Sequence, residues 1–145
     1  ARAPQARLLL VGDGPLRPAI AQKVEQAGLA GHVIFAGVRP DVPRLMLGAM
    51  DVFLMPSLYE GLGIVLVEAQ AAGLPCVFSD VVPAEADVVP ALMRRLALGQ
   101  PAAAWAEAAL CATERPPQPE ALARVEESVF NVAVSVRQLA SVYNG

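Results

Sequence analysis

The sequence predicts an α/β fold built around a parallel β-sheet, and three observations predict it. Short apolar runs alternate with helix-like segments along roughly the first eighty residues. Glycine and proline mark the junctions, so most connections are short. Hydrophobic residues make up 55% of the 145 residues and charged residues 17%, which favours strands that are buried on both faces of the sheet. A chain of this length can form one domain with a real core.

The first expected elements are a strand, a helix and a second strand. Residues 7–11 form the first apolar run. Gly14 suits an N-cap and a proline follows it, so a helix is expected over residues 15–27. Gly28 suits the C-terminal cap of that helix. The next strand is expected over residues 32–36.

The alternation continues through the middle of the chain. Asp41 can cap a short helix, and a third strand follows over residues 51–55. A helix is expected over residues 64–72, with Gly73 as its left-handed cap, and a strand over residues 76–79. This β-α-β-α-β-α-β order predicts a Rossmann-like parallel sheet with helices on both faces. A ligand crevice is then expected at the carboxyl ends of the strands.

The pattern weakens beyond residue 90, where peripheral elements are expected. They are a strand over residues 94–98, an alanine-rich helix over residues 101–113, a proline-rich break at residues 116–119 and a last helix over residues 132–144. The apolar residues of the last helix recur at helical spacing and form one stripe that must pack on something.

Charge and composition exclude several classes of protein. The net charge of −3 and the scattered arginines give no reason to expect nucleic-acid binding. No apolar run is long enough to span a membrane, and the N-terminal residues lead straight into a strand without a secretory signal. Cys76 and Cys111 have neither metal-ligand spacing nor a neighbouring histidine. Both are expected to be buried, reduced thiols in a cytoplasmic protein.

Two carboxylates eight positions apart, Glu60 and Glu68, are the strongest chemical signal. Burying an unpaired carboxylate is costly, so Glu68 within so apolar a helix indicates contact with a polar ligand. Gly61 and Gly63 allow close approach of the backbone, and the amides at the helix N-terminus suit a phosphate. Glu60 can accept hydrogen bonds from sugar hydroxyls, and Glu68 from the vicinal hydroxyls of a ribose. The alternative is that both carboxylates are merely solvated.

A second glycine-rich turn, at Gly12 and Gly14, follows the first strand. The dinucleotide fingerprint fails there because Arg17 occupies the position of its third glycine. A tight turn without ligand and a phosphate or sugar contact both remain open. His32 has no sequence partner that marks it as a base, so a structural role is expected. No GxxxxGK[ST] and no GxSxG occurs, which disfavours a nucleoside triphosphatase and a serine hydrolase.

Five motifs together resemble the C-terminal, donor-binding domain of a group 1 (family 4) glycosyltransferase with the two-domain GT-B fold. They are Leu8–Arg17, Val33–Gly37, Asp51–Ser57, the E-x7-E motif Glu60–Glu68, and Ala69–Pro75. The sequence is most similar to members that assemble capsular or exopolysaccharide.

The resemblance implies a single nucleotide-sugar-binding domain over residues 1–145. Its βα core would cover residues 7–90, and its peripheral helices residues 91–145, with a crossover helix at residues 132–144. The acceptor domain, and a first strand-helix unit that carries phosphate-clamping Arg and Lys, would precede the equivalent of residue 1. By itself the chain would bind the donor weakly and be inactive or weakly active.

The resemblance also implies roles for individual residues. Glu60 is the expected catalytic residue, through contact with hydroxyls of the transferred sugar, and Glu68 would hold the ribose. The base would meet the backbone and apolar surface after Gly37, chiefly Val38. The full set of expected substrate-binding residues is Gly12, Gly14, Gly37, Val38, Glu60, Gly61, Leu62, Gly63, Ile64 and Glu68.

The implied reaction transfers a sugar from a UDP- or GDP-sugar, with retention of configuration. No metal and no cofactor is expected, since the nucleotide sugar is the substrate. The acceptor would be a glycan or a lipid-linked sugar, reached through a missing acceptor domain or subunit. Peripheral membrane association of the full enzyme and self-association are compatible with this reading. Two alternatives stay open, a non-catalytic nucleotide-sugar-binding subunit and a GT-B-like sugar-nucleotide epimerase.

Overall fold

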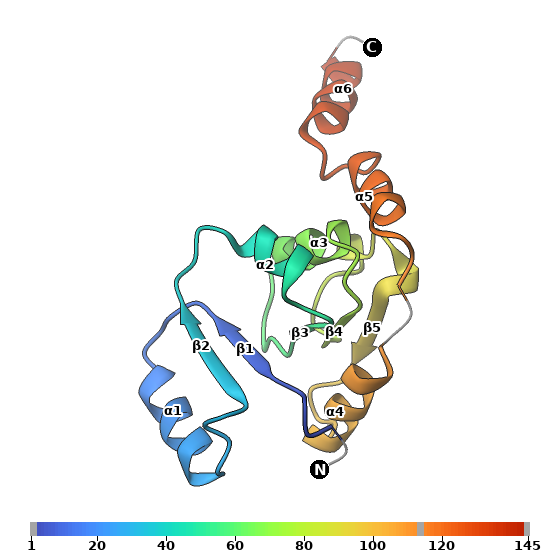
Figure 1. Ribbon diagram of the computed structural model, residues 1–145. Helices are drawn as coiled ribbons and strands as arrows, with labels where there is room; N and C mark the ends of the chain where they lie inside the picture. Colours follow the sequence, from blue (N-terminus) through green and yellow to red (C-terminus); the bar gives the residue numbers. More distant parts are fainter. Residues whose placement is uncertain (1–2, 113–114, 144–145) are drawn as a thin grey trace. The chain divides into compact units, whose positions relative to one another are not determined.

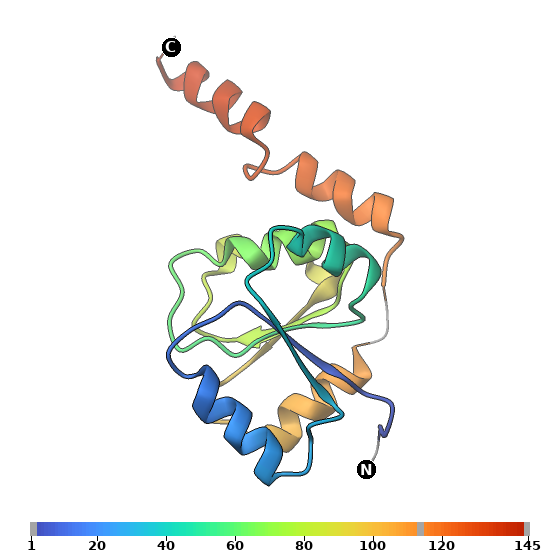
Figure 2. The same ribbon diagram turned by 60° about the vertical axis from the view of Figure 1, so that its left-hand side comes forward.

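The computed structural model describes residues 3–112 and 115–143. The chain forms two compact units, of which the first ends at Val42 and the second begins at Pro43. All strand pairs are parallel. Figures 1 and 2 show the helices and strands in two views. An α/β fold with parallel strands and intervening helices is therefore confirmed.

The first unit contains strand β1 (Leu8–Val11), helix α1 (Arg17–Gln26) and strand β2 (Val33–Gly37). The two strands pair in parallel to form a two-stranded sheet, with Leu8 opposite Val33. No described residue of this unit is buried. The expectation of strands buried on both faces is therefore wrong for β1 and β2.

Helix α1 begins two residues later than predicted. The amide of Gly14 donates to Oδ1 of Asp13 at 2.8 Å, and the amide of Arg17 donates to the carbonyl of Gly14 at 3.0 Å. These bonds hold Pro15 in a turn, and Leu16 is the N-cap. A local side-chain bond from aspartate competes with helix formation here.

The second unit contains a three-stranded sheet with helices on both faces. Strand β4 lies between β3 and β5, and α3 and α4 lie on opposite sides of the sheet (Figure 2). The elements of this part of the chain are α2 (Val42–Gly48), β3 (Phe53–Met55), α3 (Ile64–Ala71), β4 (Cys76–Ser79), the 3₁₀ turns η1 (Ala84–Ala86) and η2 (Pro90–Leu92), β5 (Met93–Leu96), α4 (Ala102–Cys111), α5 (Gln118–Glu126) and α6 (Val132–Tyr143).

The strands form two sheets where the sequence predicts one. Within the described residues, β1 and β2 make one ladder, and β3, β4 and β5 make another. Apolar alternation predicts that a segment is a strand, but it carries no information on which strand edges share hydrogen bonds. The pairing of strands could therefore not be predicted from the pattern.

The core of the described chain lies in the second unit. All four residues of β4 are buried, and α3 adds Leu66, Val67 and Ala69 to the apolar core. Ala108 of α4 is also buried, and α4 packs against β4. The predicted bounds of β4 are confirmed, and β5 begins one residue before the predicted strand.

The sequence does not predict helix α5, because three prolines within residues 116–119 indicate a break in the chain. The structure uses Pro119 in the first turn of the helix, where a fixed φ is favourable and a missing amide costs nothing. Nε2 of Gln118 donates to the carbonyl of Ala71 at 3.1 Å, which caps the end of α3. Gly73 has φ +71°, and a Cβ there would lie 3.2 Å from Cα of Gln118. Gly73 therefore serves both the predicted cap and this close approach.

The last predicted helices are confirmed in type and location. Helix α4 covers Ala102–Cys111 and α6 covers Val132–Tyr143, while Thr113 and Asn144 lie outside the described residues. Helix α6 contributes no buried residue, and its apolar stripe is exposed at Val132, Val136, Leu139 and Tyr143.

The two cysteines differ in environment. Cys76 is buried in β4, and burial raises the pKa of its thiol to about 12. Cys111 is exposed at the end of α4, so the prediction that both thiols are buried is wrong for it. An alanine-rich helix has no strongly apolar face from which to tell the buried side.

In the part of the chain that the structure describes, every helix is too short or too polar to cross a bilayer.

Gln70, on α3, ties the segment that follows β4 to the helix. Its amide nitrogen donates to the carbonyls of Leu66 at 3.1 Å and Ala86 at 2.8 Å. Its amide oxygen accepts the backbone amides of Val88 at 2.9 Å and Val89 at 2.7 Å. The side chain is fully buried, and all four of its hydrogen-bonding positions are filled. Gln70 thus replaces the backbone partners that this irregular segment lacks.

Replacing Gln70 with leucine tests this anchor. The substitution keeps the volume but leaves the buried amide of Val89 and its neighbours without partners. Gln70→Leu should lower the free energy of unfolding by about 2–4 kcal/mol. The fluorescence of Trp105, the only tryptophan of the chain, reports unfolding in urea. Gln22→Leu on the exposed surface of α1 is the matched control and should change stability by less than about 0.5 kcal/mol. Equal stability of both variants would contradict the anchor.

Candidate functional site

The expected site residues of the first unit lie at the carboxyl ends of β1 and β2. The amide of Gly12 donates to the carbonyl of Gly37 at 2.7 Å, which joins the two strand ends. Both glycines have positive φ. Val38 follows and is 80% exposed, and Gly14 has open space around it. The structure therefore brings Gly12 and Gly37 together at this edge, and Gly14 and Val38 follow them along the chain.

The other expected site residues surround the N-terminus of α3 in the second unit. The loop from Ser57 to Gly63 follows β3 and leads into the helix. Gly63 is the N-cap, with φ 77° and ψ 46°. The amides of the first helical turn have no acceptor within the helix, and the dipole adds partial positive charge there. This end of α3 is therefore able to bind an anionic group.

Gly63 is held in place by the segment after β4. A Cβ at Gly63 would lie 3.2 Å from Cγ1 of Val82 and 3.6 Å from Cε of Met55. Val82 is fixed in turn by Arg95 of β5, whose Nη1 donates to the carbonyl of Val82. Arg95 also pairs with Asp87 at 2.8 Å. Glycine is thus required here both by its left-handed conformation and by close packing.

Glu60 is positioned by two serines. Oγ of Ser57 donates to Oε1 of Glu60 at 2.7 Å. Oγ of Ser79, at the end of β4, donates to the carbonyl of Ser57 at 2.7 Å. The Glu60 side chain is half-buried and is left with free lone pairs for a ligand. The sequence pattern does not predict a role for either serine, although the hydroxyl of Ser79 at the end of an apolar run is a visible signal.

Glu68 lies on the exposed side of α3. Ile64, four residues earlier on the same face, is 54% exposed. The argument that Glu68 is a charge buried in an apolar helix is therefore wrong, since its carboxylate is not desolvated. The buried face of α3 is formed by Leu66, Val67, Ala69 and Gln70. An exposed Glu68 is accessible to a ligand but does not require one.

His32 makes contacts that fit a structural role. Nδ1 of His32 lies 3.0 Å from Nη1 of Arg7 and 3.2 Å from the carbonyl of Ala6. These contacts join the start of β2 to the segment before β1. Among the described residues, no three His, Cys, Asp or Glu side chains cluster as they would to hold a metal ion.

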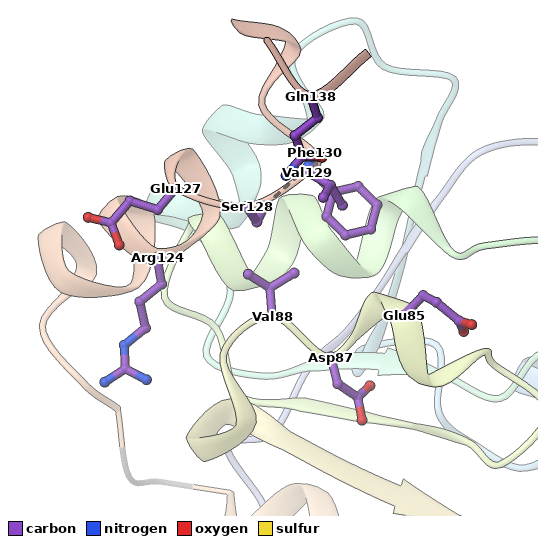
Figure 3. Close-up of a pocket in the computed structure, with 9 residues that line it drawn as sticks. All are labelled: Glu85, Asp87, Val88, Arg124, Glu127, Ser128, Val129, Phe130 and Gln138. Carbon is purple, nitrogen blue, oxygen red and sulfur yellow. Dashed lines mark hydrogen bonds between the residues drawn. The ribbon is translucent and has the colours of Figure 1, made fainter. Parts of the chain in front are cut away.

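A pocket of about 650 Å³ lies in the second unit, and none of the predicted site residues lines it (Figure 3). Figure 3 shows side chains from the segment around η1, from α5 and from the residues that follow it. Its lining residues are Glu85, Asp87, Val88, Arg124, Glu127, Ser128, Val129, Phe130 and Gln138. Arg124 and Asp87 are already paired, with Glu120 and Arg95. Three carboxylates make this pocket unsuited to a diphosphate.

Comparison with known proteins decides the family. Residues 1–115 match the family described as glycosyl transferases group 1. The chain belongs to this family. The resemblance of its motifs to the group 1 glycosyltransferases is confirmed.

Three relatives illustrate the match. EpsF of Bacillus subtilis (strain 168) is 41% identical over 140 residues, which are 95% of this chain and 36% of EpsF. WaaG, a glycosyltransferase involved in lipopolysaccharide biosynthesis, is 30% identical with a TM-score of 0.62, over 83% of this chain and 32% of WaaG. HepE of Anabaena, in complex with UDP-glucose, is 25% identical with a TM-score of 0.70, over 95% of this chain and 42% of HepE. The chain spans between about a third and two fifths of the length of these relatives.

The glycine loop of this group 1 glycosyltransferase chain offers a matched pair of substitutions. An alanine at position 63 would have to adopt the left-handed conformation of Gly63, and its Cβ would meet Val82. A Cβ at Gly61 meets nothing within 4 Å. Gly63→Ala should lower the free energy of unfolding by at least about 1–2 kcal/mol, and Gly61→Ala by less than about 0.5 kcal/mol. Urea unfolding followed through Trp105 measures both. Equal effects would show that Gly63 is not constrained as described.

Proposed function

We propose that the chain binds the donor of a retaining glycosyltransferase, which transfers a sugar from a UDP- or GDP-sugar to a glycan or lipid-linked acceptor. One observation carries the proposal. Ser57 holds the carboxylate of Glu60 in the loop that ends at the N-terminus of α3, where no side chain caps the helix. An anion site and a hydrogen-bond acceptor for sugar hydroxyls are thus built into one short segment.

The N-terminus of α3 suits the diphosphate of the donor. Backbone amides from Gly61 to Ile64 can donate to phosphate oxygens, and the helix dipole favours the negative charge. The same charge grows on the diphosphate as it leaves, so these dipoles act most strongly in the transition state. Leu62 contributes through its amide, which does not depend on its side chain. No metal or cofactor is needed for this step, and we propose that none takes part.

Glu60 and Glu68 suit different parts of the donor. Glu60 precedes the helix and can accept hydrogen bonds from hydroxyls of the transferred sugar. Glu68 lies about 6 Å further along the helix axis than Ile64, and its side chain is exposed. We assign to it the two hydroxyls of the ribose, because the two oxygens of a carboxylate can accept one hydrogen bond from each hydroxyl.

The site residues expected in the first unit are assigned by themselves. Gly12 and Gly14 offer backbone close to the strand ends, and Val38 offers an exposed apolar surface after Gly37. We assign the diphosphate or sugar to the two glycines and the base to Val38. The structure of HepE in complex with UDP-glucose, at 25% identity, supports a uridine nucleotide as the first ligand to test.

Calorimetric titration of the full-length protein that carries this chain tests these assignments. Glu68→Ala should weaken the binding of UDP-glucose and of UDP by about 10- to 100-fold, because a charge-assisted hydrogen bond is lost in both. Glu60→Gln should weaken the binding of UDP-glucose by about 10-fold and change the Kd for UDP by less than about twofold. The same comparison is made with GDP-mannose and GDP.

Glu126→Ala is the matched control, since Glu126 is an exposed carboxylate at the end of α5. It should bind all four ligands as the wild-type protein does. If Glu68→Ala also binds them like wild type, the ribose assignment is wrong. If the wild-type protein binds none of the four, the proposed function is wrong for these donors.

A further inference from the structure

Two polar side chains are buried in the described part of the chain, Gln70 and Ser79. Both use their hydrogen bonds to hold loops. Gln70 is saturated by the backbone around η1. Ser79 ends β4, is completely buried and donates to the carbonyl of Ser57 at 2.7 Å. Since a buried hydroxyl is costly unless it is bonded, this single contact accounts for the serine.

The hydroxyl of Ser79 is not needed to fix the end of its own strand. The amide of Asp80 donates to the carbonyl of Leu96 at 2.9 Å, and the carbonyl of Ser79 accepts the amide of Val82 at 3.3 Å. These backbone bonds would remain with alanine at position 79. The side chain therefore adds only the link to Ser57.

That link continues to Glu60. Ser79 donates to the carbonyl of Ser57, and Oγ of the same Ser57 donates to Oε1 of Glu60 at 2.7 Å. Fixing the carbonyl of Ser57 restricts its backbone, and with it the position of its hydroxyl. Two hydrogen bonds thus connect a completely buried strand to a half-buried carboxylate at the site.

We propose that Ser79 is a positioning residue that acts through Ser57 to orient the carboxylate of Glu60 toward the sugar of the donor. This inference rests on the proposed function. Because Ser79 bonds to the Ser57 carbonyl and not to the helix amides, its effect falls on the sugar-dependent part of the affinity. The nucleotide part, assigned to α3 and Glu68, is left unchanged.

The test compares UDP-glucose with UDP, or GDP-mannose with GDP, in the full-length protein by calorimetric titration. Ser79→Ala should raise the Kd for the nucleotide sugar by about 5- to 10-fold, as expected for one hydrogen bond, and that for the nucleotide by less than about twofold. Combining Ser79→Ala with Glu60→Gln should cost no more than Glu60→Gln alone, because both remove the same oriented contact.

Two further variants complete the design. Ser57→Ala breaks the same link at a half-buried loop position and should show the same selective loss, even if Ser79→Ala does not fold. Ser141→Ala is the control, since Ser141 also donates to a backbone carbonyl, that of Gln138, but on exposed α6. It should bind both ligands like wild type.

The outcomes separate this inference from the proposed function. If Glu60→Gln loses sugar-dependent affinity while Ser79→Ala and Ser57→Ala do not, the positioning role is overturned and the proposed function stands. Equal losses for nucleotide and nucleotide sugar would also overturn it, because they indicate a general structural role. A wild-type protein that binds neither nucleotide sugar overturns the proposed function and this inference together.

Discussion

The complete burial of strand β4 is the constraint on which the rest of the site depends. A strand covered on both faces must be apolar, and any polar group at its end must find a partner inside the protein. Ser79 meets this requirement by bonding to the loop that carries Glu60. Gln70 meets the corresponding requirement on α3 by bonding to the segment around η1. The most buried part of the chain thereby fixes both the loop of the candidate site and the segment around η1.

The position of the helix N-terminus follows from the same packing. Val82 closes the space beside Gly63 and is itself fixed by Arg95. The guanidinium of Arg95 also lies over the ring of Phe78, 4.6 Å from its centroid, so this group is restrained on several sides. The amides that we assign to the diphosphate are therefore supported by side chains of β4, β5 and the connection between them. Preorganised donors of this kind are the most effective in stabilising a leaving group.

The sequence predicted most elements and the family, because glycines, prolines and apolar periods are local signals. It could not predict which strands pair, since ladder partners are set by packing. The apolar neighbours of Glu68 suggested burial, but helix α3 turns this one carboxylate outward, and linear composition does not show rotation about the helix axis. The link from Ser79 to Glu60 joins residues of two segments, so it required coordinates. Pro119 follows two other prolines that indicate a break in the chain, yet the first turn of a helix accepts proline.

We propose that the loop from Ser57 to Gly63 and the first turn of α3 bind the diphosphate and the sugar of the donor. Hydrogen exchange of the full-length protein with and without UDP-glucose or GDP-mannose tests it most directly, because amides that donate to phosphate become protected. Exchange should slow most on binding in peptides that cover residues 60–66, and should not change in α6. Binding that protects the pocket around Phe130 and leaves residues 60–66 unchanged would contradict it.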